Sequence, residues 1–191
     1  MAKIRRMAVL CLLAIIVTRG GAQAEGIKYT RTVESYTIPD VTLVNQDGRK
    51  VRFKELMRSR KPVIVDFIFG TCTTICPILS ASFANLQHKL GPDSGKIELV
   101  SISIDPENDT PKVMKEYLKR YRAKPGWTFL TGTRADIDKV MYAFNAYIPD
   151  KMSHYPITII RLTPDAKQWI RIFGLMGSSE FLNECRKIGI Q

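Results

Sequence analysis

The chain has 191 residues, of which 45% are hydrophobic and 25% charged, and its formal net charge at pH 7 is +11. This length and composition suit one globular domain with a hydrophobic core, and they exclude a low-complexity chain. No repeat of fixed period is present, so a repeat array is excluded as well.

The N-terminus has the three parts of a secretory signal peptide. Lys3, Arg5 and Arg6 are basic, residues 7–17 form an apolar run, and residues 22–24 read Ala-Gln-Ala, a small-residue cleavage site. The run is shorter than the roughly 20 apolar residues that a transmembrane helix needs. Residues 1–24 therefore predict a signal peptide, with an uncleaved N-terminal anchor as the alternative.

Export has consequences for charge and cysteine chemistry. Without the four basic residues of the signal segment the net charge is about +7, which favours an acidic protein partner or an anionic membrane surface. The basic residues are scattered, so nucleic acid is not expected as a partner. We expect a periplasmic protein, or a membrane-anchored one facing the periplasm. Cleavage after Ala24 leaves Cys72, Cys76 and Cys185 in an oxidising compartment, where free thiols need a reason.

Residues 25–35 are polar and predict a flexible linker, followed by one domain over residues 36–191. The Asp47-Gly48 dipeptide within residues 41–53 predicts a β-hairpin. Residues 61–69 form a nearly continuous apolar run, typical of a central strand that is buried on both faces.

Helical and extended segments then alternate. Apolar residues recur at helical spacing over residues 74–90, and residues 96–104 predict a strand. Asp109 or Thr110 is expected to cap a helix that runs to about Arg122. The remaining predicted elements are a strand over residues 127–132, a helix over 134–147, strands over 156–162 and 169–174, and a helix over 178–188.

This order predicts the α/β class, with a parallel core and an antiparallel edge. It is the order of the thioredoxin-like fold, with an N-terminal β-hairpin and one extra βα insertion.

Cys72 and Cys76 lie where the predicted central strand passes into a helix. They could form a structural disulfide, a redox pair or two soft metal ligands. A helix N-terminus stabilises a thiolate, and ligands in open α/β sheets bind beyond the carboxyl ends of the strands. Three residues separate the cysteines, one more than in thioredoxin-type enzymes. A structural zinc site needs four ligands, and the sequence offers no second cysteine pair. Two thiolates with one histidine imidazole would make a soft site of low coordination number, which favours copper.

The mature chain has two histidines. His88 falls on an amphipathic helix and is expected to face solvent, whereas His154 directly precedes a strand in a loop expected opposite the cysteines. Cys185 is expected to be a buried apolar residue. Met141, Met152 and Met176 could offer sulfur to copper, and Met152 is near His154, although core or surface packing is the better expectation.

Three segments together resemble the Sco/SenC family: DFIFGTCTTICPILS, SISIDPENDTP and MSHYPITIIRLTPD, in that order. The resemblance covers roughly residues 36–189. It implies a thioredoxin-like copper protein that helps to assemble the binuclear copper centre of cytochrome c oxidase. Cys72, Cys76 and His154 would bind Cu(I) or Cu(II), and Asp105 would lie beside them or dock a partner. The expected partner is the oxidase copper-site subunit or another copper chaperone.

Other interpretations remain open. Pro156 stands where thioredoxins keep a cis-proline, which would suit a thiol–disulfide oxidoreductase acting through Cys72 and Cys76. A peroxiredoxin would need a proline where Phe69 stands, and Arg161 is the only plausible arginine for it. A binding module with a structural disulfide is the remaining alternative.

Overall fold

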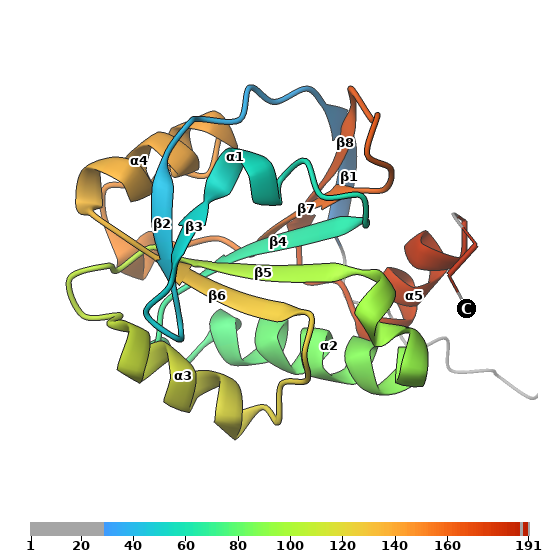
Figure 1. Cartoon of the computed structure of the whole chain (residues 1–191), viewed down its shortest axis with the longest axis horizontal. Coiled ribbons are helices and arrows are strands. Elements are labelled where there is room, and N and C mark those ends of the chain that lie inside the picture. The colour runs from blue at the N-terminus through green and yellow to red at the C-terminus, as the bar shows by residue number, and fades with distance from the viewer. Residues whose placement is uncertain (1–28, 188, 191) are drawn as a thin grey trace, which may run out of the picture.

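An eight-stranded mixed sheet forms the centre of the fold, in the strand order β1-β8-β7-β4-β5-β6-β2-β3 (Figure 1). The computed structural model describes residues 29–187, 189 and 190. The strands are β1 (Tyr29–Glu34), β2 (Thr42–Asn45), β3 (Lys50–Arg52), β4 (Val63–Ile68), β5 (Glu98–Ser103), β6 (Trp127–Thr131), β7 (Ile157–Arg161) and β8 (Trp169–Gly174). Strands β4, β5 and β6 are parallel, and β7 and β8 continue the sheet antiparallel to them.

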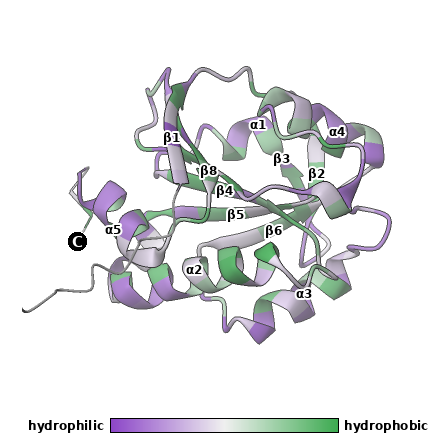
Figure 2. Cartoon of the chain, turned by 180° about the vertical axis from the view of Figure 1, so that it is seen from behind, coloured by the Kyte–Doolittle hydropathy of each residue, from purple (hydrophilic) through white to green (hydrophobic). Residues whose placement is uncertain are grey.

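The helices cover both faces of the sheet. Helices α2, α3 and α5 lie against one face, and α1 and α4 lie against the other (Figure 1). Their bounds are α1 (Phe53–Leu56), α2 (Ile75–Leu90), α3 (Pro111–Arg120), α4 (Arg134–Ala143) and α5 (Ser178–Arg186), with 3-10 turns at η1 (Gly91–Lys96) and η2 (Lys151–Ser153). Figure 2 shows polar and apolar residues interleaved along the outer helices, because only one side of each packs on the sheet.

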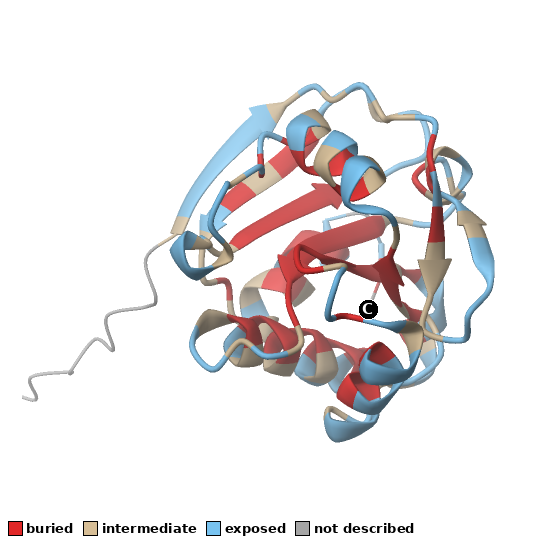
Figure 3. Cartoon of the chain, turned by 90° about the vertical axis from the view of Figure 1, so that its left-hand side faces the viewer, coloured by how far each residue is buried: buried red, intermediate tan, exposed pale blue. Residues whose placement is uncertain are grey.

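The core consists of two aromatic-rich layers on opposite faces of β4. All six residues of β4 are buried, as the continuous apolar run predicts. The ring of Phe67 contacts that of Phe144 on the α4 side. On the other side Phe83 contacts Trp127 and Phe181 edge to face. Figure 3 shows buried residues filling the central strands and the inner sides of the helices.

This arrangement confirms the predicted fold class. The hairpin of β2 and β3 pairs around Asp47-Gly48, and Gly48 has a φ of 75°, which this turn requires. Helix α3 and strand β6 form the extra βα insertion between β5 and α4. Thr110 is the N-cap of α3, since its side chain accepts a hydrogen bond from the Val113 N–H.

Two boundaries differ from the sequence expectation. The linker expected over residues 25–35 is wrong for residues 29–34, which form β1 and pair with β8 along six residues. Most of β1 is exposed, so its sequence carries no apolar alternation. Helix α4 ends at Ala143 rather than at residue 147, because Asn145 has a φ of 52° and Arg171 binds the carbonyl oxygens of Phe144 and Asn145.

The signal-peptide prediction for residues 1–24 lies outside the described residues, as do Cys11 and Ile188. Within the part of the chain that the structure describes, no helix is long and apolar enough to cross a membrane.

Candidate functional site

Cys72 and Cys76 lie at the carboxyl end of β4, where the chain turns into α2. Cys72 is in the loop before the helix, and its N–H donates to the Phe69 carbonyl at 3.2 Å. Cys76 is the second residue of α2 and is completely buried. The predicted placement at a strand-to-helix junction is thus confirmed, although only one of the two cysteines is helical.

The Cys72 sulfur contacts residues at the start of α2. The N–H of Cys76 donates to the Cys72 sulfur at 3.4 Å, and the Thr74 hydroxyl lies 3.7 Å from the same sulfur. Cys72, Cys76 and Cys185 are all free thiols in the structure. The Cys72 sulfur is therefore the acceptor of a small group of donors at the start of α2, which is the environment that stabilises a thiolate.

The two thiols have opposite acidities. Burial alone would raise the pKa of Cys72, but hydrogen bonds from Cys76 and Thr74 outweigh it, and its pKa lies below the usual value. Burial raises the pKa of Cys76 strongly, and the Cys72 and Asp66 side chains add to this effect. The pair thus combines a partly exposed thiol whose pKa is lowered with a buried thiol whose pKa is raised.

This difference predicts selective alkylation. At pH 7 with limiting iodoacetamide, Cys72 should be modified well before Cys76 and Cys185, because it is the most accessible of the three and the only one whose pKa is lowered rather than raised. Peptide mapping by mass spectrometry would measure the three rates, and Cys72→Ser should remove the fast reaction. Equal rates at Cys72 and Cys76 would contradict the burial and pKa of the pair.

His154 follows the turn η2 and directly precedes the residues that lead into β7. Its Nε2 atom is buried and has no hydrogen-bond partner among the described residues. Burial lowers the pKa of His154 to about 4, while a hydrogen bond with the Phe67 backbone acts in the opposite direction. The imidazole is therefore neutral at pH 7 and retains a nitrogen lone pair for a ligand.

A cavity of about 110 Å³ joins these elements. Its walls include Phe69, Cys72 and Thr74 on one side and Lys151, Met152 and His154 on the other. Cys76 does not line it. Within residues 29–187, no three His, Cys, Asp or Glu side chains lie close enough together to hold a metal ion. The donors have the chemistry that copper needs, but Cys72, Cys76 and His154 are not assembled around one point.

Asp105 connects the loop after β5 to the turn that carries His154. Its buried carboxylate accepts a hydrogen bond from Asn108 at 3.0 Å and pairs with the Lys151 ammonium group at 2.5 Å. Lys151 lines the same cavity as Cys72 and His154. Asp105 is therefore linked to this cavity through Lys151, and no hydrogen bond between Asp105 and either cysteine is present among the described residues.

Asp109 was expected to do no more than cap a helix, and here the sequence reasoning missed a residue that supports the site. Asp109 is fully buried, accepts from the Ser103 hydroxyl at 2.5 Å, and accepts from the Gly70 N–H at 3.0 Å. Gly70 must be glycine, since a Cβ there would lie 2.8 Å from the carboxylate. Asp109 thus fixes the backbone two residues before Cys72. The remote Gly70–Asp109 pairing left no signal in the local sequence.

Asp66 on β4 adds a second buried carboxyl group on the α2 side of the sheet. Both of its oxygens are buried without a hydrogen-bond partner in the described structure. Burial raises its pKa to about 7, against smaller lowering effects from Ser101 and the backbone. Its charge is one of the causes that raise the pKa of Cys76.

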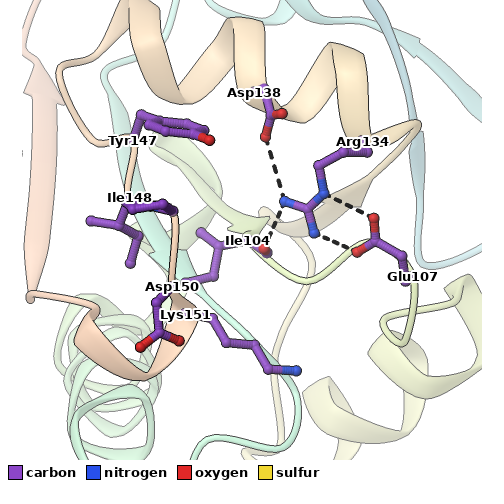
Figure 4. A pocket seen from close by; sticks show the side chains of 9 residues that line it. Ile104, Glu107, Arg134, Asp138, Tyr147, Ile148, Asp150 and Lys151 are labelled. Atoms are coloured by element: carbon purple, nitrogen blue, oxygen red, sulfur yellow. Dashed lines mark hydrogen bonds and ion pairs between the residues drawn. The ribbon is translucent and has the colours of Figure 1, made fainter.

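A larger cavity of about 400 Å³ adjoins the site and shares Lys151 with it (Figure 4). Glu107 and Arg134 form a two-point ion pair on its wall, with Arg134 Nε donating at 2.8 Å. Arg134 also donates to the Ile104 carbonyl at 3.1 Å. These contacts tie the loop after β5 to the start of α4, next to the turn that carries His154.

Several other candidates lie away from the cysteines. Arg161 is buried at the opposite end of β7, where it donates to the carbonyl oxygens of Ser59, Lys61 and Pro164, so it cannot serve a peroxidatic cysteine. The bond before Pro156 is trans. His88 is exposed, and Cys185, Met141 and Met176 are buried, as expected. Met152 lies at the surface, where 76% of it is exposed, and is not part of the core.

The sheet order β8-β7-β4-β5 and a dithiol at the start of the helix after β4 define a thioredoxin-like protein. The family model described as SCO1/SenC matches residues 30–179, and the chain belongs to the SCO1/SenC family.

Curated relatives agree with this membership. The chain is 35% identical to "SCO1 protein homolog" of Bacillus subtilis over 117 residues, which cover 60% of each chain. It is 30% identical to "Protein SenC" of Rhodobacter capsulatus over 119 residues, which cover 62% of this chain and 52% of the relative. The matched region thus spans less than two thirds of the length of these relatives.

Solved structures show the same fold. BsSco, a member of the Sco family of cytochrome c oxidase assembly proteins in which a disulfide switch was identified, has a TM-score of 0.66 and 26% identity, covering 82% of this chain and 95% of its own. Arabidopsis thaliana ScoI with copper bound has a TM-score of 0.61 and 27% identity, covering 76% and 96%.

Proposed function

We propose that this protein carries copper for assembly of the copper centre of cytochrome c oxidase. Cys72 and Cys76 supply two thiolates, and His154 supplies a ring nitrogen. The observation that carries the proposal is one cavity lined both by Cys72, a thiol with a lowered pKa, and by His154, a neutral imidazole whose Nε2 is buried without a partner among the described residues. The copper bound by the Arabidopsis relative and the oxidase-assembly role of BsSco support it.

The donor set explains which copper ions would bind. Two thiolates are soft ligands that select Cu(I), and an added imidazole also suits Cu(II). Since the three residues are not assembled around one point, binding requires the turn η2 and the start of α2 to approach each other. Cys76 must also release its proton, so binding should weaken as the pH falls.

Copper and redox state are coupled in this proposal. Oxidation of the two thiols to a Cys72–Cys76 disulfide removes both thiolates and would release or block the metal. Delivery would proceed by ligand exchange with the oxidase copper-site subunit or with another copper chaperone. We further propose that the protein is exported and acts in the periplasm, free or anchored to the membrane.

A Cu(I) titration of the reduced, metal-free chain against a competing chelator tests the proposal. The wild type should bind one tight equivalent, and both Cys72→Ser and Cys76→Ser should lose it. Cys185→Ser is the matched control, because this thiol is buried on α5, and it should keep the tight equivalent. Wild-type binding no tighter than that of the two site variants would overturn the copper-carrier function.

A thiol–disulfide oxidoreductase is the second candidate. The unequal pair favours it, since Cys72 could attack a substrate disulfide as a thiolate and buried Cys76 could then resolve the mixed disulfide. Its substrate would be the oxidised cysteines of a copper site or of other exported proteins. Reduction of an oxidised copper-site peptide by the wild type, and not by Cys72→Ser, would support this activity.

A further inference from the structure

Met152 is an exposed methionine that lines the same cavity as two of the proposed copper ligands, Cys72 and His154. It lies in the turn η2, two residues before His154, and 76% of its surface is exposed, the largest value among the exposed large hydrophobic residues of the described chain. The side chain nevertheless forms part of the same cavity wall as Cys72 and His154. Burial in the core therefore does not explain its position, and a methionine sulfur is a soft ligand suited to Cu(I).

The donor residues that line the cavity differ by one from the proposed final ligand set, Cys72, Cys76 and His154. Cys76 has no exposed surface and does not line the cavity, whereas Cys72, Met152 and His154 all do. The cavity lining thus supplies residues with a thiol, a thioether and an imidazole, while the second thiol is buried outside that lining.

The backbone of the turn holds Met152 in this place. The Met152 N–H donates to the Asp150 carboxylate at 2.9 Å, and the His154 N–H donates to the Lys151 carbonyl at 3.2 Å. The Lys151 ammonium group is in turn paired with buried Asp105. The thioether is thus presented by an anchored turn rather than by a free loop.

We propose that Cys72, Met152 and His154 form an entry and exit site for Cu(I), from which the ion moves inward to Cys76. This inference rests on the proposed copper-carrier function and deepens it. In the inward step the Met152–copper bond breaks and a Cys76–copper bond forms. The Cys76 thiol releases one proton to water, and copper remains Cu(I) throughout. Exit to a partner is the reverse exchange.

The first test compares transfer rates in wild type and Met152→Leu, which keeps the size of the side chain and removes the sulfur. Stopped-flow absorbance would follow Cu(I) release to a water-soluble Cu(I) chelator. We expect release to slow about tenfold, as the loss of one weak ligand in the exchange step would cause, with little change in equilibrium affinity. Met141→Leu, in the buried face of α4, is the matched control and should release copper like wild type.

The second test observes the site itself. In selenomethionine-labelled Cys76→Ser, loaded at high concentration, copper should stay at the entry site. Selenium-edge X-ray absorption should then detect a copper neighbour, which Cys76→Ser/Met152→Leu should lack. Wild-type release rates in Met152→Leu, or no copper neighbour of selenium, would overturn the entry site alone. Failure of the wild-type chain to bind Cu(I) would overturn the proposed function and the entry site together.

Discussion

With His154 as the proposed nitrogen ligand, His154→Ala should weaken Cu(II) binding at least about 100-fold, because loss of a ligand exceeds the roughly 10–100-fold cost of removing residues that only support one. Cu(I) affinity should fall much less, since the two thiolates of Cys72 and Cys76 are sufficient for this softer ion. The difference follows from the neutral imidazole, whose Nε2 is buried and unpartnered in the described structure.

Competition titrations with Cu(II) and Cu(I) chelators would measure both affinities for the wild type and the variant. His88→Ala is the matched control, because His88 is exposed on α2 and should change neither affinity. Unchanged Cu(II) binding in His154→Ala would remove His154 from the ligand set. If His154→Ala also reduced disulfides at the wild-type rate, a thiol–disulfide oxidoreductase would describe the protein better than a copper carrier.

Asp66→Asn should stabilise the folded protein by on the order of 4 kcal/mol at pH 8 and by little at pH 4. Burial raises the pKa of Asp66 from 3.8 to about 7 in the folded state, and each pKa unit corresponds to about 1.4 kcal/mol. The folded state therefore binds more protons than the unfolded state between these values. The part of the free energy of unfolding that depends on protonated Asp66 is fully present below pH 4 and is lost as the pH rises towards 7.

Urea unfolding of the reduced chain at a series of pH values would test this expectation. The free energy of unfolding of the wild type, minus that of Asp66→Asn, should become more negative between pH 4 and 7 and then level off. Asp40→Asn, at an exposed position, is the control and should track the wild type at every pH. A constant difference between wild type and Asp66→Asn would show that Asp66 does not titrate in this range.

Most of the fold was predictable because local patterns decide it. The apolar run of residues 61–69 predicts a strand covered on both faces, as β4 is, and the helical spacing of residues 74–90 matches α2 to within one residue. Strand β1 was missed because its exposed residues gain their order from pairing with β8, a contact about 140 residues away in sequence. The end of α4 was missed because it depends on Arg171 on β8, which donates to the carbonyl oxygens of Phe144 and Asn145 just after the helix.

The sequence by itself determined the chemistry of the site: a Cys-x-x-x-Cys pair after a buried strand, and a histidine before a later strand, on a thioredoxin-like domain. Only the tertiary structure decided how these groups differ. It buried Cys76 and left Cys72 accessible, which separates their acidities. It placed Met152 on the cavity wall and tied Gly70 to Asp109. These properties depend on desolvation and on contacts between distant segments, which no local pattern encodes.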